Sequence, residues 1–307
     1  MYERYYKTAG ITLAVSSDLP ILGDTFDPKF KEFEVKAPGE DTVYLHHHFH
    51  LMDMGSSEPG KKVYEKPPWM IYEGKNQFTY VWTSSDANTH DLKRGAIFSK
   101  DHTQGVIYND ESNLNRYDSG NIGALTLFPT DQILIARLMG DRKGCVLHSA
   151  GMIMNGNGLI FAGHSDAGKS TISLIMKNRA TLLCDDRNII RRQGQGFRLY
   201  GTWSHGDVDD VSSDSADLKA ICFLKQAKEN RLVRLEDKKI ILKNRLACLV
   251  KPFVTAQWWN KTLDVITEIV RQVPCYELCF DKSGSVVTLL EDEFKLNGTR
   301  IFTEIHR

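Results

Sequence analysis

Two patterns of hydrophobic and polar residues divide the chain. Up to about residue 128 the segments ITLAVSSDLPIL, KEFEVK, TVYLHHHFHLMDM, PPWMIYEG and QFTYVWTSS alternate apolar with polar residues or are rich in β-forming residues. Such alternation favours strands, and the stretches SSDLP, APGED and SSEPGKK supply turns between them. The pattern predicts a β-rich N-terminal region, residues 1–128, without a strong helix.

From residue 129 the pattern becomes that of a mixed α/β domain, residues 129–307. Helical spacing in TDQILIARLMGDRKG predicts a helix with Thr130 as its N-cap. The next segment, CVLHSAGMIMNGNGLIFAG, reads as a β-hairpin that turns at NGNG. Beyond it we expect a helix at about 169–179, helices within about 239–272, strands at ATLLCDD, FRLYGTW and LKAICFLKQA, and a closing hairpin around Lys282–Ser285.

Composition narrows the function classes. The 307 residues carry 39 basic and 39 acidic side chains, so no bulk charge favours nucleic acid or an anionic membrane as partner. The start MYERYYKTAG lacks the blocks of a signal peptide, and no apolar run approaches the roughly 18–20 residues of a membrane span. Six cysteines lie scattered, several in apolar runs, which favours buried reduced thiols and a cytoplasmic protein.

A glycine-rich turn carries the strongest chemical signal. Gly163, Gly168, Lys169 and Ser170 in GHSDAGKS match G-x-x-x-x-G-K-[ST], between an expected strand and an expected helix. In this pattern backbone N–H groups enclose phosphate oxygens, the lysine reaches the outer phosphates, and the hydroxyl ligates Mg²⁺. We therefore expect a site for ATP and Mg²⁺, with a chance glycine turn as the alternative. The expected site also includes His164, Ser165, Asp166, Ala167 and Thr171.

Two adjacent carboxylates follow this helix. Asp185 and Asp186 end the apolar segment ATLLCDD. One carboxylate at such a strand end can serve the metal, while its neighbour accepts a proton from an attacking hydroxyl. The alternative is a solvated strand end.

The stretch VLHSAGMIMNGNGLIFAGHSDAGKSTISLIMKNRATLLCDDRNII resembles the catalytic core of HPr kinase/phosphorylase and its relatives. The resemblance implies a P-loop core like that of HPr kinase and phosphoenolpyruvate carboxykinase, of mixed sheet with helices. It also implies roles for three side chains. His148 corresponds to the family's strand histidine and would orient Asp185, the proton acceptor, and Asp186 would be the acid on the metal side.

Other segments extend the resemblance to about residues 130–290. LYGTWSHGD is similar to the G-T-P-W-H-G segment of HPr-kinase-related proteins found beside bacterial biosynthetic clusters. The chain departs from them in having Trp203-Ser204 for Pro-Trp and Asp166 where glycine is commoner. It also lacks a counterpart of the longer signature by which HPr kinases recognise HPr, which argues against HPr itself as the acceptor.

Three further residues are candidates for substrate contact. Arg187 follows the acidic pair and could reach a transferred phosphoryl group, or could form a surface ion pair. Thr202 and His205 lie in the glycine-flanked segment and could touch substrate or phosphate. The alternative for His205 is an ordinary loop histidine.

Some conspicuous residues favour structural interpretations. In HHHFH, alternation places His46, His48 and His50 on one strand face, where they could bind a metal, but no Cys or Glu completes a set nearby. A half-exposed strand is therefore the favoured reading. For Cys275 and Cys279, which share a face, a redox or metal role is the weaker alternative, and for Trp258 and Trp259 core packing is favoured over stacking on a substrate.

Together these observations predict an ATP-dependent kinase that phosphorylates a hydroxyl. The resemblance favours a serine of a peptide or small protein, such as a ribosomally made lasso peptide precursor. The alternatives are a nucleotide-dependent binding or regulatory module without transfer, and a kinase for a small-molecule hydroxyl. Carboxykinase-like chemistry would need an arginine and a metal-ligand histidine and lysine set that the sequence does not offer. The oligomeric state stays open, a homo-oligomer included.

Overall fold

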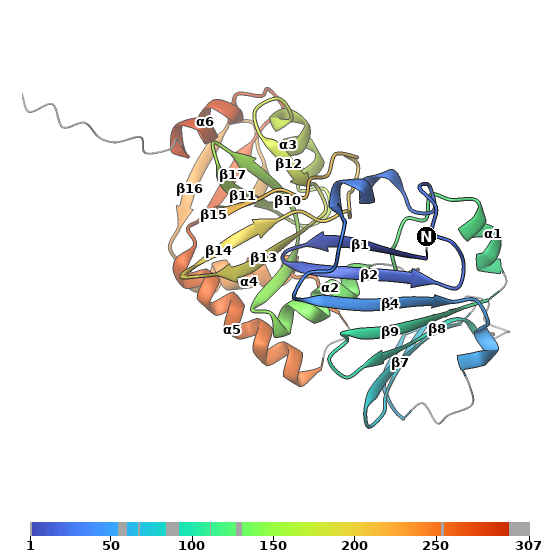
Figure 1. The fold of residues 1–307 in the computed structure, drawn as a ribbon. Helices are drawn as coiled ribbons and strands as arrows, with labels where there is room; N and C mark the ends of the chain where they lie inside the picture. Colours follow the sequence, from blue (N-terminus) through green and yellow to red (C-terminus); the bar gives the residue numbers. More distant parts are fainter. Residues whose placement is uncertain are drawn as a thin grey trace, which may run out of the picture.

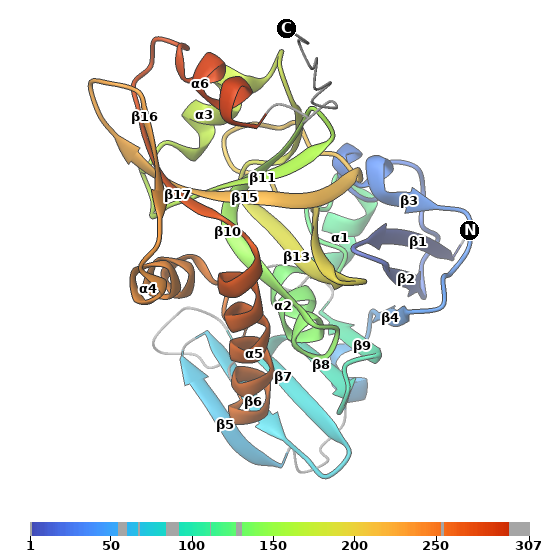
Figure 2. The same cartoon turned by 90° about the vertical axis from the view of Figure 1, so that its left-hand side faces the viewer.

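The computed structural model describes residues 2–54, 60–66, 68–83, 92–110, 112–126, 131–252 and 255–294. Over these residues the chain is a mixed α/β protein whose strands form two large mixed sheets, with few helices (Figure 1). The mixed α/β class expected from the sequence is thereby confirmed. The N-terminal sheet comes from the first part of the chain and the C-terminal sheet from the second, and Figure 2 shows both from the side.

The N-terminal sheet joins its described strands in the order β3-β1-β2-β4-β9-β8-β7-β6-β5. β2 pairs with β4 and β4 pairs with β9 in parallel, whereas the other neighbours are antiparallel. Burial alternates along β4, because successive side chains point to opposite faces of the sheet. The strands are β1 (Glu3–Thr8), β2 (Ile11–Ser17), β3 (Glu34–Val35), β4 (Thr42–His48), β5 (Lys61–Lys66), β6 (Trp69–Glu73), β7 (Gln77–Thr83), β8 (Leu92–Ser99) and β9 (Gln104–Asn109).

Short helices interrupt this sheet where the sequence indicated only strands and turns. The 3₁₀ helix η1 (Pro28–Phe33) occupies the first half of the expected strand KEFEVK, and only Glu34–Val35 of that segment form a strand, β3. Its first residue is proline, which suits a helix start, and Asp27 caps it by accepting a hydrogen bond from the Lys29 N–H at 3.1 Å. Two further short helices, η2 (Leu51–Met54) and α1 (Ser112–Asp118), were not expected either.

The C-terminal sheet has the described strand order β11-β10-β13-β14-β15-β17-β16, with β12 paired to β10. β11 also pairs with β15 in parallel, so that β11, β10, β13, β14 and β15 form a closed ring of pairings. The strands are β10 (Gly144–Met154), β11 (Asn157–Ala162), β12 (Thr181–Cys184), β13 (Arg187–Gln193), β14 (Gly196–Tyr200), β15 (Ser215–Gln226), β16 (Arg231–Leu235) and β17 (Cys275–Phe280).

The predicted hairpin is confirmed as β10 and β11. The two strands pair antiparallel from Ser149↔Ala162 to Met154↔Asn157. Asn155 and Gly156 form the turn with φ of 51° and 75°, as a two-residue turn with two left-handed positions requires. This hairpin delivers the chain to the glycine-rich loop.

Helices cover both sides of the C-terminal sheet. α5 lies against the sheet beside α2, on the side opposite α3 and α6 (Figure 2). Trp258 on α5 is fully buried and its indole N–H donates to the carbonyl of Ala136 on α2 at 2.9 Å, which confirms its packing role. The helices are α2 (Asp131–Asp141), α3 (Lys169–Met176), α4 (Lys238–Cys248), α5 (Ala256–Gln272) and α6 (Val286–Glu293).

The hairpin expected around Lys282–Ser285 is wrong. β17 ends at Phe280 and the chain continues into helix α6. Val286 and Leu290 are buried one helical turn apart, on the core side of that helix. The short apolar run VVTLL does not distinguish a strand from a helix by its periodicity, and here packing decides for the helix.

A buried hydrogen bond ties the two sheets' cores together. The indole N–H of Trp203 donates to Asp131 Oδ2 at 2.8 Å, and the Trp203 ring packs edge-on against Phe33 of the N-terminal part. Asp131 also accepts from the backbone N–H groups of Leu125 and Thr126, at 2.8 Å each. The departure at position 203 from the related G-T-P-W-H-G segment therefore places an anchor under the glycine-flanked loop.

Some expectations fall outside what the structure tests. The predicted N-cap Thr130 and residues 127–129 lie outside the described residues, and the domain boundary at 128/129 stays a prediction. All six cysteines are buried and free, as expected. Among the described residues no helix is both long and apolar enough to cross a membrane.

Candidate active site

The glycine-rich loop connects β11 to α3 and needs glycine at both ends. Gly168 has φ of 102°, and a Cβ there would lie 2.7 Å from the Phe280 ring. A Cβ at Gly163 would lie 2.4 Å from the Cβ of Ala167. Because contacts this short are not tolerated, glycine at 163 lets the chain pack against Ala167, and glycine at 168 lets it pack against the Phe280 ring.

The middle of the loop is exposed, and a residue of a neighbouring strand fixes its position. His164, Ser165 and Asp166 are exposed, whereas Ala167 is buried in the core. Asp166 adopts a left-handed backbone with φ of 65°, which aspartate tolerates better than most residues. The side-chain amide of Gln226 on β15 donates to the Asp166 carbonyl at 2.6 Å, so this strand helps to fix the loop.

The N-terminus of α3 carries positive partial charge, and no side chain caps its free N–H groups. Gly168 is the N-cap residue and makes no side-chain capping bond. The first N–H groups of a helix lack partners within the helix and carry its positive partial charge. An uncapped helix start of this kind, next to a lysine, is suited to bind an anion.

The ammonium group of Lys169 folds back toward the glycine-rich loop. Its ammonium group donates to the carbonyls of Gly163 at 3.3 Å and His164 at 3.1 Å. The side chain is largely buried, and this burial lowers the pKa of Lys169, although nearby Cys248 and the carboxylates of Asp186 and Asp185 act in the opposite direction. The positive charge of Lys169 is therefore held beside the loop and does not extend into solvent.

Ser170 brings two carboxylates together. Its hydroxyl lies within hydrogen-bond distance of Asp185 Oδ2 at 3.2 Å and of Asp207 Oδ2 at 2.9 Å. One hydroxyl and two carboxylates, all hard oxygen donors, form a set of the kind that Mg²⁺ prefers. The donor set therefore fits a magnesium ion.

Asp185 is the more deeply buried member of the acidic pair. It is 2% exposed and accepts hydrogen bonds from the backbone N–H of Gly206 at 2.5 Å and of Val208 at 3.1 Å. These donors come from the loop after β14 and stabilise the carboxylate in its buried position. They also fix the orientation of Asp185 toward Ser170.

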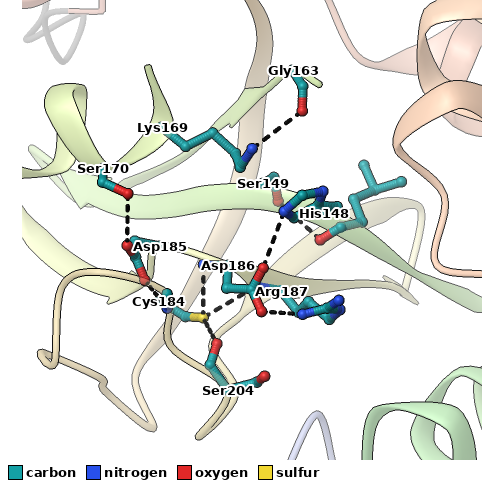
Figure 3. Close-up of polar contacts among 12 residues, drawn as sticks. His148, Ser149, Gly163, Lys169, Ser170, Cys184, Asp185, Asp186, Arg187 and Ser204 are labelled. Carbon is teal, nitrogen blue, oxygen red and sulfur yellow. Dashed lines mark hydrogen bonds and ion pairs between the residues drawn. The ribbon is translucent and has the colours of Figure 1, made fainter. Parts of the chain in front are cut away.

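Asp186 faces a different set of partners (Figure 3). His148 Nε2 on β10 lies 3.1 Å from Asp186 Oδ1, and the Arg187 guanidinium pairs with Oδ2. Burial alone raises the pKa of Asp186, but the hydrogen bond from His148 and the charges of Arg187, His148 and Lys169 outweigh it and lower the net pKa. The expected pairing of His148 with Asp185 is therefore wrong, since His148 contacts the neighbouring carboxylate.

A buried sulfur shapes the turn that separates the two carboxylates. Cys184 Sγ accepts hydrogen bonds from the N–H groups of Asp186 at 3.3 Å and Arg187 at 3.2 Å (Figure 3). Burial raises the pKa of Cys184 to about 11, so it stays a neutral thiol at physiological pH. The chain turns at this sulfur, and the two aspartates consequently point toward different partners.

One cavity of about 400 Å³ is lined by Lys169, Ser170, His148 and the aspartates described above. This volume is within the range of small-molecule sites, and the lining is mainly polar. The lining residues are His148, Ser165, Asp166, Gly168, Lys169, Ser170, Thr171, Asp185, Asp186, Gly206, Asp207 and Gln226.

The three candidate substrate residues are placed differently. Arg187 is engaged by Asp186, and Thr202 is buried, with its hydroxyl donating to the Arg187 carbonyl at 2.7 Å. His205 Nδ1 lies 3.5 Å from Asp209 Oδ1. None of these three lines the cavity. The buried Thr202 thus holds the backbone at Arg187 in place, and the geometry does not favour its direct contact with a substrate.

Three lining residues were not anticipated as site residues: Gly206, Asp207 and Gln226. The first two belong to the segment LYGTWSHGD, whose resemblance to related proteins was the available signal. Gln226 ends the strand LKAICFLKQA and nothing in its local sequence distinguishes it.

Comparison with known families bears on the same part of the chain. The model of the family described as SynChlorMet cassette protein ScmC matches residues 127–295. The chain belongs to the ScmC family. The ScmC match contains the loop, the acidic pair and all the residues that line the cavity.

Other comparisons add little to the ScmC assignment. The solved structure of the Hpr(Ser) kinase/phosphatase from Coxiella burnetii is similar to this chain with 11% sequence identity and a TM-score of 0.29, over 48% of this chain and 95% of that chain. So low a TM-score does not establish a common fold. Among curated proteins no match is found.

Proposed function

We propose that this protein is an ATP-dependent phosphotransferase that moves the terminal phosphoryl group to a hydroxyl. The observation that carries the proposal is the convergence of Lys169 and Ser170, at the start of α3, with Asp185 and Asp186 across one cavity. A cation, a hydroxyl and two carboxylates in this arrangement are the parts that phosphoryl transfer uses.

The loop and helix α3 would hold the phosphates of ATP. Ser165, Asp166 and Gly168 of the loop line the cavity, and the uncapped start of α3 adds positive partial charge. Lys169, the first residue of α3, donates to carbonyls of this loop and would neutralise the outer phosphates. Thr171 lines the cavity next to Ser170 and would contact the phosphates.

Ser170, Asp185 and Asp207 would hold the metal. Mg²⁺ held by these residues would neutralise the negative charge of the phosphates. The hydrogen bonds from the backbone N–H groups of Gly206 and Val208 keep the Asp185 carboxylate oriented toward Ser170. Asp207 enlarges the donor set that the sequence indicated.

Asp186 and His148 would serve the acceptor hydroxyl. This reverses the roles expected from the resemblance, and two contacts support the reversal: His148 pairs with Asp186, and Ser170 with Asp185. The lowered pKa of Asp186 keeps its carboxylate ionised and able to accept a proton. Alignment and charge neutralisation would supply most of the acceleration, because phosphoryl transfer asks little covalent chemistry of the protein.

The acceptor class rests on the resemblance to HPr-kinase-related proteins. We propose a serine hydroxyl of a peptide or small protein, and a catalytic domain, residues 129–307, with an HPr-kinase-like P-loop core behind a β-rich N-terminal region. A ribosomally made precursor peptide fits this class, and a small-molecule hydroxyl is the alternative acceptor. We further propose a cytoplasmic location, without nucleic acid or membrane as partner.

A transfer assay separates this function from a nucleotide-dependent binding module. The purified chain is incubated with ATP labelled in its terminal phosphate, Mg²⁺ and a library of serine-containing peptides, and phosphopeptides are identified by mass spectrometry. If the protein is a kinase, the unaltered chain should yield labelled peptide, and Asp186→Asn should yield far less in the same time. Binding of ATP without any transfer to peptides or small hydroxyl compounds, and without hydrolysis, would instead support the binding module.

A further inference from the structure

The N-terminal sheet carries a cluster of polar side chains that is separate from the lining of the candidate active site. Asp18 follows β2, and His46 and His48 lie on β4, which pairs with β2 in parallel (Figure 1). His46 Nε2 is 3.0 Å from Asp18 Oδ1, and His48 Nδ1 is 2.7 Å from Asp18 Oδ2. One ligand atom from each of the three residues lies within 4.8 Å of the other two.

The strand pairing explains this convergence. Ser16 and His46 are register partners, so the chain leaving β2 passes beside the histidines of β4. Alternation along β4 directs His46 and His48 to the partly exposed face, while His47 between them is buried. The sequence placed the histidines on one face, but the carboxylate arrives from 28 residues earlier in the chain.

Each of these three side chains is oriented by a further contact. Ser16 Oγ lies 2.9 Å from Nδ1 of His46, the ring nitrogen opposite the one facing Asp18. Asp53 Oδ2 lies 2.8 Å from Nε2 of His48 in the same relationship. The backbone N–H of Phe49 donates to Asp18 Oδ2 at 3.2 Å. Outer contacts of this kind orient metal ligands and set the tautomer of a ligating histidine.

We propose that Asp18, His46 and His48 form a binding site for a divalent transition metal ion, with Zn²⁺ the best match. Two imidazoles and one carboxylate suit Zn²⁺ and its neighbours, whereas Mg²⁺ and Ca²⁺ prefer sets made entirely of oxygen. Three protein ligands leave a fourth position for water. The metal joins the end of β2 to β4 and stabilises the N-terminal sheet.

Charged and aromatic side chains surround His48. The groups facing it are Asp18, Asp53, His46, His50 and Tyr108. The two carboxylates place negative charge beside the imidazoles, which favours a divalent cation between them.

Metal titration of the tag-free, chelator-treated full chain tests this site. Zn²⁺ is added in competition with a chromophoric chelator and in excess Mg²⁺, which occupies oxygen-rich sites. We expect one tightly bound Zn²⁺ per chain, and Co²⁺ in its place should give visible absorption bands of a four-coordinate site. Asp53→Asn should weaken binding about 10–100-fold, as loss of an outer contact does.

Matched carboxamide variants separate a built site from adventitious binding. Asp18→Asn and His46→Ala should each lower the affinity by more than Asp53→Asn does, whereas Asp24→Asn, an exposed carboxylate outside the cluster, should leave it unchanged. Zn²⁺ should raise the thermal midpoint of the unaltered chain but not that of Asp18→Asn. Absence of stoichiometric binding, or equal binding by Asp18→Asn and Asp24→Asn, would overturn the proposal and leave a hydrogen-bonded cluster.

Discussion

His148 and Asp186 lie side by side in the lining of the cavity, with His148 Nε2 3.1 Å from Asp186 Oδ1. The neighbouring carboxylate, Asp185, faces Ser170 instead. Two adjacent residues therefore belong to two different groups of contacts. This relationship divides the proposed work of the site between a metal side and an acceptor side.

This division predicts that the two aspartates fail differently when changed to asparagine. Asp186→Asn should lower kcat about 10²–10⁴-fold, because a proton acceptor contributes roughly that factor, while ATP binding in the presence of Mg²⁺ stays unchanged. Asp185→Asn should raise the Mg²⁺ concentration needed for half-maximal activity, since it removes a metal ligand. Steady-state kinetics over a Mg²⁺ series measures both. Identical Mg²⁺ dependence in the two variants would contradict the division.

The lowered pKa of Asp186 predicts the acid limb of the pH–rate profile. The proposed proton acceptor must be ionised, and a lowered pKa keeps it ionised below the ordinary range of an aspartate. His148→Ala removes a hydrogen bond that lowers this pKa, so the acid limb of kcat/KM should move to higher pH. A profile measured for both chains tests this. A limb that stays in place or moves to lower pH would show that His148 does not act on the proton acceptor.

The Trp203–Asp131 hydrogen bond predicts a stability effect outside the cavity. Trp203→Phe keeps most of the ring but removes a buried N–H donor to a carboxylate, which should cost about 1.5–3 kcal/mol of unfolding free energy. Denaturant unfolding measures the change. Trp259→Phe, at a partly buried tryptophan of α5, is the control and should cost less. Equal losses would show that the hydrogen bond does not anchor the loop.

Gly168 and Gly284 form a matched pair for testing the loop geometry. Both have positive φ, 102° and 85°, but a Cβ at Gly168 meets the Phe280 ring at 2.7 Å, whereas at Gly284 nothing lies within 4 Å. Both alanine variants carry a backbone cost of roughly 1–2 kcal/mol. Gly168→Ala should lose more than Gly284→Ala in denaturant unfolding and should also bind ATP more weakly. If both variants bind ATP equally, the closed loop is not needed for the nucleotide.

Local patterns were sufficient to predict the hairpin β10–β11, the glycine-rich loop and helix α3. Each depends on residues next to one another, such as Asn155-Gly156 at the turn and Gly168 before Lys169. The mistaken hairpin near Lys282 shows the limit of such patterns, because a short apolar run fits a strand or a helix until its packing is known.

The pairing of side chains across the site could not be predicted in the same way. Which of two successive aspartates meets His148 depends on how the chain turns at Cys184, and the sulfur contacts that set this turn leave no periodic signal. Asp207 reaches Ser170 from 37 residues away. Asp18 likewise joins the histidines of β4 only because β2 and β4 are neighbours in the folded sheet.

Calorimetric titration of the chain with ATP in the presence of Mg²⁺ tests the central claim most directly. One ATP should bind per chain, and Lys169→Ala should abolish or greatly weaken binding while its unfolding midpoint stays close to that of the unaltered protein. Lys177→Ala, at an exposed lysine just beyond α3 that pairs with Asp210, should bind as the unaltered chain does. Absence of ATP binding by the unaltered chain, or equal affinity in Lys169→Ala, would contradict the account.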